Sequence, residues 1–396
     1  MDQLPLFLLD LLFRPENVRQ LQIDNLNEEE VSLLARTCAQ HRIGPLLSES
    51  IKKANLSVPD TLSDYLTKAN KKSIQRYLAI QSELIAINKL FSENEIPLVV
   101  LKGAVISSDV YPSPHLRPMR DLDVLIERKD TKKAVQLLKD NGYTPEINLD
   151  VFDLDATKDF PNIYSPHRRC IIELHIQVLD SHPKRPDLLD VLDCKEFAKS
   201  ASDILKHSKY NYHHFSDTIM LLHLAIHASY SHTFNCGPLF ISDIGMLIQR
   251  NEVNWPRFWE LCEEGQWTKG CLITLQIVEL YWSNVTIDWP TSQDSFTHNL
   301  NLSSIAALSL QNLEYKEGIG LRKNIATQHW FIYALKKLII PKANLARAYN
   351  IEVTSWKLYL FYIIRPFNRL MSFFRTKNDP DTKTSVQVHT YLESKD

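Results

Sequence analysis

Apolar residues recur every three or four positions along most of the chain, a spacing that predicts a mainly helical protein. Residues 27–53 and 60–94 follow this spacing, and Asn27 before three glutamates is typical of a helix N-terminal cap. The opening stretch MDQLPLFLLDLLFRPEN is apolar, but Asp2 precedes the run, Asp10 interrupts it and no small-residue cleavage site follows. It therefore predicts a first helix and not a signal peptide.

The pattern changes near Pro97, which breaks the second long helix. The fully apolar run from Pro97 to Leu101 predicts a buried strand. Short helices and strands then alternate, which predicts a small α/β unit. The further expected elements are a helix over 104–110, a strand over 122–126, a helix over 131–141 stopped by Gly142, and a strand around 170–178.

From about residue 195 the helical spacing resumes, and FSDTIMLLHLAIHASYSH is apolar all round, as in a buried helix. The polar end TKNDPDTKTSVQVHTYLESKD predicts a disordered tail. The expected fold class is α+β, with a small mixed-sheet core between N-terminal and C-terminal helical regions. The expected domains are an N-terminal helical region over 1–74, an α/β core over 75–190, a C-terminal helical domain over 191–375 and the tail over 376–396.

The composition excludes some partners. The 396 residues carry 45 basic and 47 acidic side chains, so no general positive field attracts DNA or an anionic membrane. Six scattered cysteines show neither a C-x-x-C pair nor a zinc spacing, which favours a reducing cytoplasm. A mean hydropathy of -0.22 is that of a soluble globular protein.

The most apolar late segment, WKLYLFYIIRPFNRLMSFFR over 356–375, has an uninterrupted apolar run only from Leu358 to Ile364. This run is much shorter than the roughly 20 residues that span a bilayer. Its arginines would allow the segment to lie on a membrane surface. Packing of the helix on the rest of the protein is the favoured interpretation.

The candidate chemistry begins with Asp121 and Asp123, which lie two positions apart on the second expected strand. Residues i and i+2 of a strand point to the same side, so the two carboxylates project together. They repel each other unless a cation lies between them, which makes a Mg²⁺ site, with Mn²⁺ as the alternative, the functional interpretation. For the pair taken alone, the favoured interpretation is that one aspartate caps a turn and the other is solvated at a strand end. The neighbouring residues change this balance.

Possible phosphate contacts surround this pair. Gly103 follows an apolar strand and opens a helix, an arrangement in which backbone N–H groups receive a phosphate. Lys102 adds a positive charge beside it, and Arg117 and Arg120 flank the aspartates as further anion contacts.

A third carboxylate lies on the last strand of the unit. In CIIELHIQV, Glu173 and His175 share one face. If this strand pairs beside the Asp121 strand, Glu173 completes a carboxylate cluster that could accept a proton from an attacking hydroxyl and help to hold a second metal. His175 could orient Glu173, contact a phosphate or serve as a structural hydrogen-bonding residue. His223 and His227 have the spacing of metal ligands on a helix, but packing is favoured for both.

The motifs VVLKGAVIS, YPSPHLRPMRDLDVLI and IIELHIQ resemble a family of uncharacterised bacterial nucleotidyltransferases with a K-G, R-x-x-x-D-x-D and (D/E)-L-H signature. This family belongs to the DNA polymerase beta-like superfamily. The stretches LLHLAIHAS, ISDIGMLI and LIIPKANLARAYNI are similar to the family's helical region, so the resemblance covers most of residues 75–355.

The resemblance implies two-metal transfer of NMP from an NTP, most simply ATP, to an unidentified hydroxyl acceptor, with release of pyrophosphate. Asp121, Asp123 and Glu173 would bind the metals, and Lys102 and Gly103 would contact the triphosphate. Ala104 stands where the wider superfamily usually has serine, so Lys102 or Ser107 would replace the hydroxyl.

His227 and Asp243 resemble a polar link between helices in the same family, on the acceptor side of a cleft, although Asp243 could equally cap its helix. A nucleotide-binding regulatory protein without turnover is the alternative function. A kinase-like phosphotransferase is disfavoured, because neither a glycine-rich loop nor an H-x-D catalytic loop is present.

Overall fold

The computed structural model describes residues 4–146, 160–166, 169–179, 204–207, 212–290, 300–327, 342, 345, 351, 354–376 and 379–394. The chain forms two compact units. The first unit comprises residues 1–231 and 236–299, and the second comprises residues 232–235 and 300–396.

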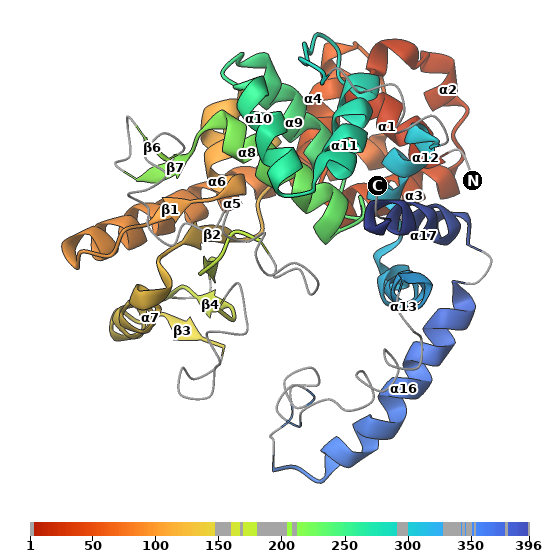
Figure 1. Cartoon of the computed structure of the whole chain (residues 1–396). Helices are drawn as coiled ribbons and strands as arrows, with labels where there is room; N and C mark the ends of the chain where they lie inside the picture. Colours follow the sequence, from red (N-terminus) through yellow and green to blue (C-terminus); the bar gives the residue numbers. More distant parts are fainter. Residues whose placement is uncertain are drawn as a thin grey trace. The chain divides into compact units, whose positions relative to one another are not determined.

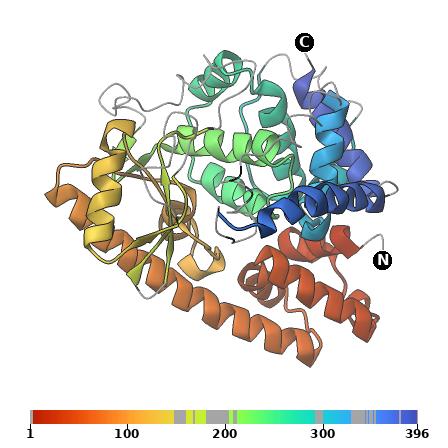
Figure 2. The same cartoon turned by 90° about the horizontal axis from the view of Figure 1, so that it is seen from below.

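The first unit begins with the helices that the apolar spacing predicts. Asn27 caps the third of them as expected, because its side chain accepts a hydrogen bond from the backbone N–H of Glu30 at 3.0 Å. The longest helix, α5, contains 34 residues and runs from the N-terminal helices to the sheet (Figure 2). The helices are α1 (Leu4–Phe13), α2 (Gln20–Asp24), α3 (Glu28–His41), α4 (Gly44–Lys53) and α5 (Asp60–Glu93), with a 3-10 turn over Pro15–Asn17.

A mixed seven-stranded sheet follows, in the order β3-β4-β5-β2-β1-β7-β6. Figure 1 labels β1, β2, β3, β4, β6 and β7. The β2–β5 and β1–β7 pairs are parallel, and the other neighbouring pairs are antiparallel. The strands are β1 (Val99–Val100), β2 (Leu122–Leu125), β3 (Thr144–Pro145), β4 (Ile163–Tyr164), β5 (Ile171–His175), β6 (Ile204–Lys206) and β7 (His213–Phe215). The predicted α+β class is confirmed.

The sheet is wider than the sequence predicts. The three expected strands are present as β1, β2 and β5, but each is shorter than its apolar run. Strands β6 and β7 lie beyond residue 195, where only helices were expected, and β7 pairs with the central strand β1. Three-residue strands carry too few residues to display a period of two, which is why the pattern does not reveal them. The domain boundaries predicted from the sequence stay predictions.

Helices that follow the strands complete the first unit. Every residue of α8 is buried, as its uniformly apolar sequence predicts. These elements are α6 (Lys102–Val105), a π-helical turn η2 (Ile106–Val110), 3-10 turns η3 (Pro114–Leu116) and η4 (Arg128–Asp130), α7 (Thr131–Asp140), α8 (Asp217–Ile226), a π-helical turn η9 (His227–Ser231), α9 (Leu239–Gln249), α10 (Trp255–Glu264) and α11 (Thr268–Tyr281).

The second unit is helical, and it corrects the prediction of a disordered tail. Residues 380–393 form α17, which packs against α12 and α13. The Asp379 side chain caps this helix by accepting from the backbone N–H of Thr382 at 2.8 Å, and Val388 is buried. The prediction was wrong because part of the buried face is polar, so composition hides it. The elements are α12 (Leu302–Ala307), 3-10 turns over Leu308–Leu310 and Leu313–Tyr315, α13 (Lys316–Thr327), α16 (Lys357–Arg375) and α17 (Pro380–Glu393).

No helix among the described residues combines the length and the apolar character needed to cross a bilayer.

Candidate active site

The site is built on two neighbouring parallel strands, β2 and β5. Their register places Asp123 opposite Glu173, and Leu125 opposite His175. Asp123 and Glu173 therefore project from adjacent strands toward the same side of the sheet. Leu122 and Leu174, which alternate with them, are fully buried on the other side. The apolar positions thus fix the register that brings the two carboxylates together.

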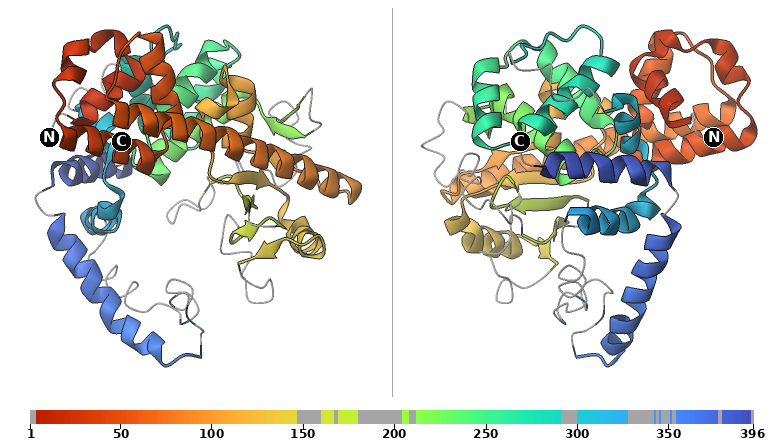
Figure 3. Two further views of the ribbon diagram at one scale, coloured as in Figure 1. Left: turned by 180° about the vertical axis from the view of Figure 1, so that it is seen from behind. Right: turned by 45° about the vertical axis from the view of Figure 1, so that its right-hand side comes forward.

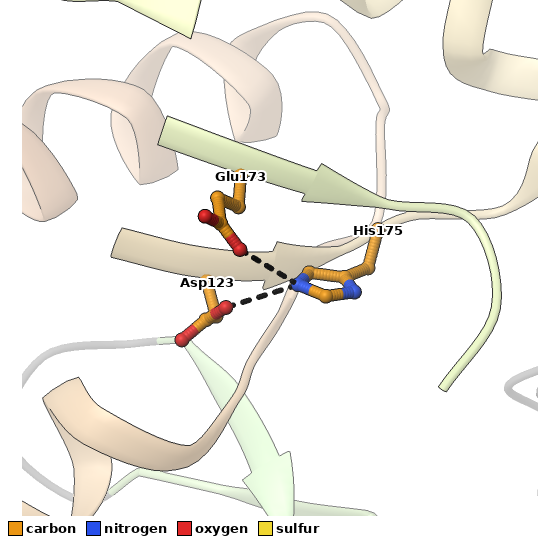
Figure 4. Close-up of side chains that lie close together, drawn as sticks. All are labelled: Asp123, Glu173 and His175. Carbon is orange, nitrogen blue, oxygen red and sulfur yellow. Dashed lines mark hydrogen bonds and ion pairs between the residues drawn. The ribbon is translucent and has the colours of Figure 1, made fainter. Parts of the chain in front are cut away.

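His175 joins the two carboxylates (Figure 4). Its Nε2 atom lies 3.0 Å from Oδ1 of Asp123 and 3.9 Å from Oε2 of Glu173. Asp123 and His175 are buried, whereas the side chain of Glu173 is 34% exposed. A cluster with two buried members and one accessible carboxylate can hold a cation and still meet a substrate.

The donor set fits a divalent cation. One atom from each of Asp123, Glu173 and His175 lies within 4.8 Å of the other two. Carboxylates suit Mg²⁺ and Mn²⁺, and an imidazole nitrogen suits Mn²⁺ and later transition metals. The Nδ1 atom of His175 is buried and has no hydrogen-bond partner among the described residues. This atom can carry the ring proton when Nε2 faces a metal.

Asp121 lies one position before β2 and is not a member of this three-residue group among the described residues. Burial and the neighbouring charge of Asp123 raise the pKa of Asp121, against the opposing effects of Arg42, Arg120 and Lys102. Asp121 is therefore an electrostatic neighbour of Asp123, half-buried at the edge of the cluster.

Among the groups that lower the pKa of Asp123, Lys102 has the largest effect. Burial alone would raise the pKa of Asp123, but the Lys102 ammonium and the hydrogen bond with His175 outweigh burial and lower it. Lys102 has a φ of 35°, a left-handed conformation that is unfavourable for a residue with a side chain. Such strain persists where the surrounding structure imposes it, and it is common at functional sites.

Gly103 and Arg117 lie in direct contact. A Cβ atom at position 103 would lie 2.8 Å from Nη1 of Arg117, so only glycine leaves room for the guanidinium. Asp243 on α9 holds Arg117 through two hydrogen bonds, from Nε at 2.9 Å and Nη2 at 2.8 Å. The Tyr111 hydroxyl also donates to Asp243 at 2.8 Å. Asp243 thus anchors the loop before β2 to α9.

The remaining predicted residues differ in position. Ser107 is fully buried and its hydroxyl donates to the Ala104 carbonyl, so it is better described as a core residue than as a phosphate contact. The side chain of Arg120 is exposed beside the cluster. His227 lies in the turn after α8, where its ring meets that of His223 edge to face at 6.4 Å. His223 also lowers the pKa of Asp123, so α8 contributes to the field at the site.

The N-terminal helices supply two cationic residues that sequence reasoning missed. Arg42, directly after α3, interacts electrostatically with Asp121 and with the arginines at 76, 117 and 120. Burial and these three like charges lower the pKa of Arg42, against the attraction of Asp121. Arg76 on α5 donates to the backbone carbonyls of Arg169 and Arg120. The sequence carries no motif around either arginine, because only the fold brings α3 and α5 to the sheet.

These residues form a cationic cluster around Asp121, which we define as Arg42, Arg76, Lys102, Arg117 and Arg120. Its charges repel one another, and the carboxylates of Asp121, Asp123 and Asp243 offset them in part. An anion with several charges would relieve this repulsion. The candidate site thus places a group of possible cation ligands beside a cluster of positive charges.

A family model described as uncharacterised nucleotidyltransferase matches residues 27–283, which is well over half of the chain. The chain belongs to this family, and the predicted family is confirmed. The match ends at residue 283, so it does not reach the later stretch LIIPKANLARAYNI that the resemblance included. The match begins earlier than the resemblance drawn from motifs and includes α3 and α5, the helices that bring Arg42 and Arg76 to the site. No curated protein and no solved structure matches the chain.

Proposed function

We propose that the protein transfers NMP from an NTP to a hydroxyl group and releases pyrophosphate, in a reaction that depends on a divalent cation. The observation that carries this proposal is the Asp123–Glu173–His175 group beside the cationic cluster, within the residues that match the family. Mg²⁺ is the expected cation and Mn²⁺ the alternative, and ATP is the expected donor. The acceptor is a small molecule or a protein side chain.

The proposed roles follow from exposure and charge. Asp123, Glu173 and His175 would hold the cation, which supplies charge neutralisation and polarises the phosphate oxygens. The partly exposed carboxylate of Glu173 would accept the proton of the acceptor hydroxyl. The hydroxyl oxygen would then bond to the α-phosphorus, and the bond from that phosphorus to pyrophosphate would break. Asp121 is proposed as a further carboxylate at the cation.

The cationic cluster is proposed to bind the triphosphate. Lys102 and Arg120 would neutralise charge on the leaving pyrophosphate, and Arg42 would join them from α3. Arg76, whose guanidinium is bound to two backbone carbonyls, would act by positioning the Arg120 loop. Gly103 would contribute by admitting the Arg117 guanidinium.

The test uses the purified chain with each of four α-labelled NTPs, with Mg²⁺ or Mn²⁺, and with cell extract as the source of acceptor. We expect label transfer with pyrophosphate release, and a loss of ~10³-fold or more in Asp123→Asn, because the proposed cation site loses its buried carboxylate ligand. Glu173→Gln should lose a comparable amount through loss of the base. The matched control is Asp64→Asn, an exposed aspartate on α5.

Two results would reject the proposal: no release of pyrophosphate with any NTP and cation, or release that persists in Asp123→Asn. Arg42→Gln offers a finer test of the triphosphate contact. We expect KM for the NTP to rise about tenfold with little change in kcat if Arg42 binds the donor equally in the ground and transition states.

A nucleotide-binding regulatory protein without turnover is the second candidate. The observation that favours it is that Ser107 is buried and Arg117 is paired with Asp243, so two predicted phosphate contacts are already engaged. Nucleotide binding without pyrophosphate release would favour this function. For location we propose the cytoplasm, where free thiols such as Cys38 and Cys262 persist.

A further inference from the structure

Helix α16 has two apolar faces, and one of them packs inside the second unit. Leu358 is buried together with Leu345, and Phe361 and Tyr362 pack against them. The helix also contacts α13, where Arg322 lies 3.8 Å from the centre of the Phe373 ring. This face provides the packing against the rest of the protein that was expected for residues 356–375.

The opposite face is also apolar, but it is exposed. Six large side chains with exposed fractions between 42% and 73% repeat with the spacing i, i+4, i+7, i+11, i+15 and i+18. This spacing places them in one narrow stripe, because each helical residue advances by about 100°. We call it the α16 stripe: Trp356, Leu360, Ile363, Phe367, Met371 and Phe374. Figure 3 shows the full length of this helix in blue.

The charged residues in the segment that carries the stripe have one sign. Residues 354–376 contain four basic residues and no aspartate or glutamate. Lys357 and Arg375, both exposed, follow the first and last residues of the stripe by one position. Lys342 adds a third cation, since its ammonium donates to the hydroxyl of the exposed Tyr359 at 2.7 Å. Cations therefore stand at both ends of the apolar surface.

We propose that α16 binds to the surface of an anionic lipid bilayer. A stripe of large apolar side chains that includes tryptophan, with cations at its margins and without acidic residues, matches the chemistry of the headgroup boundary. The stripe enters the acyl boundary, while Lys357 and Arg375 extend their charges to lipid phosphates. The helix lies in the plane of the membrane. This orientation agrees with the finding that no helix among the described residues is long and apolar enough to cross a bilayer.

Charge distinguishes this occupant from a second copy of the chain. An isologous contact between two α16 stripes would bring the cations of one copy near those of the other, with no acidic residue in 354–376 to compensate them. An anionic bilayer compensates them directly. The inference does not depend on the proposed nucleotidyl transfer.

The experiment is flotation of the full chain with phosphatidylcholine vesicles that contain phosphatidylglycerol as about one third of the lipid, beside vesicles of phosphatidylcholine alone. We expect binding to the anionic vesicles. Ile363→Ser/Phe367→Ser should lower the partition coefficient by ~10-fold or more. Lys357→Gln/Arg375→Gln should lower it by about fivefold for each cation removed.

The matched control is Leu21→Ser/Leu78→Ser, which removes two leucines that are 65% and 60% exposed on α2 and α5. This variant should bind as the wild type does. Brominated lipids should quench tryptophan fluorescence in the wild type and should lose that effect in Trp356→Phe, which reports insertion of the stripe itself.

The proposal is overturned if the wild type does not bind anionic vesicles, if Ile363→Ser/Phe367→Ser binds them unchanged, or if phosphatidylcholine vesicles bind equally well. It is also overturned if light scattering shows a dimer that Ile363→Ser/Phe367→Ser dissociates, because the stripe would then be an interface between copies. Circular dichroism of each variant verifies that the exposed substitutions leave the fold intact.

Discussion

Two regions of the molecule, the strand pair β2–β5 and the helix α16, depart from the usual distribution of side chains. The strands bury polar groups, and the helix exposes apolar ones. At the strands, Asp123 and His175 are buried. On α16, six large apolar side chains face outward. Folded proteins normally bury apolar groups and expose charged ones, because desolvating a charge is unfavourable and burying apolar surface is favourable. Neither arrangement therefore serves stability, which is why we assign chemistry to the first region and a lipid surface to the second.

The two regions differ in how far their unusual side chains depend on partners in the fold. The buried charges of the site are paired, as in the contacts of Asp123 with His175 and of Asp243 with Arg117. Removing one partner leaves the other unpaired in the interior. The α16 stripe has no such dependence, because each exposed side chain contributes little to folding. Substitutions should therefore alter the free energy of unfolding strongly near the strands and weakly in the α16 stripe.

The largest effect on stability is expected for Asp243→Asn. The side chains of Arg117 and Asp243 are only 14% and 4% exposed, so the substitution leaves a buried guanidinium without its counter-charge. We expect a loss of about 3–5 kcal/mol in the free energy of unfolding, measured with urea. The control is Glu260→Gln, which breaks the exposed pair of Glu260 with Arg257 and should change stability by less than about 1 kcal/mol. Equal losses in the two variants would contradict the distinction.

Gly103→Ala should have the next largest effect. The added methyl would lie 2.8 Å from Nη1 of Arg117, and the guanidinium is held by Asp243, so we expect a loss of roughly 1–3 kcal/mol. Gly320→Ala is the matched control, since nothing lies within 4 Å of the added atom, and a helix prefers alanine by about 0.5–1 kcal/mol. The midpoint of denaturant unfolding should fall in Gly103→Ala and rise in Gly320→Ala. Destabilisation of both would argue against the Gly103–Arg117 contact.

Asp121→Asn should change the pH dependence of stability with the cation removed by a chelator. The pKa of Asp121 is raised in the folded protein, so its contribution is present at low pH and lost as the pH rises through the folded pKa. The variant should therefore be more stable than the wild type at neutral pH. Asp123 has a lowered pKa, so its contribution is present above the unfolded pKa and lost on acidification. The raised pKa of Asp121 would be refuted if the free energy of unfolding fell more steeply in Asp121→Asn than in the wild type as the pH rises above the ordinary aspartate range.

The smallest effect on stability is expected on α16. Ile363 is 73% exposed, so Ile363→Ser should change the free energy of unfolding by less than about 0.5 kcal/mol. Leu358→Ala, on the buried face of the same helix, should lose about 2–5 kcal/mol if the second unit unfolds cooperatively. Thermal unfolding of both variants compares the two faces. A large loss in Ile363→Ser would mean that the stripe is packed.

The helices and the central strands could be predicted because their apolar residues repeat. The spacing of α3 and the cap at Asn27 identify a helix without reference to anything distant. Strand β7 and helix α17 could not be predicted in this way. The first has three residues, and the second buries Thr382 and Ser385 beside Val388, so neither shows a regular apolar face.

The site was only partly accessible from the sequence. The second aspartate of the D-x-D pair and the later E-L-H motif supply the residues that the structure brings together in the Asp123–Glu173–His175 group, whereas Asp121 lies outside it. Three features needed the fold: His175 as a direct neighbour of Asp123, Asp243 as the partner of Arg117, and Arg42 beside Asp121. Each joins residues that are far apart along the chain, and no local spacing encodes such a pairing.

The sequence by itself determined the class of fold, the family and the identity of most charged residues at the site, because periodicity and short motifs are local properties. Only the tertiary structure decided which charges meet and which surfaces remain exposed. The parallel register of β2 and β5 sets Asp123 beside Glu173, and α5 brings Arg76 to the same place. The packing of α16 likewise decides that Leu358 is covered and Ile363 is not. The burial of a residue depends on the neighbours that it gains when the chain folds, and the sequence alone does not show which residues these are.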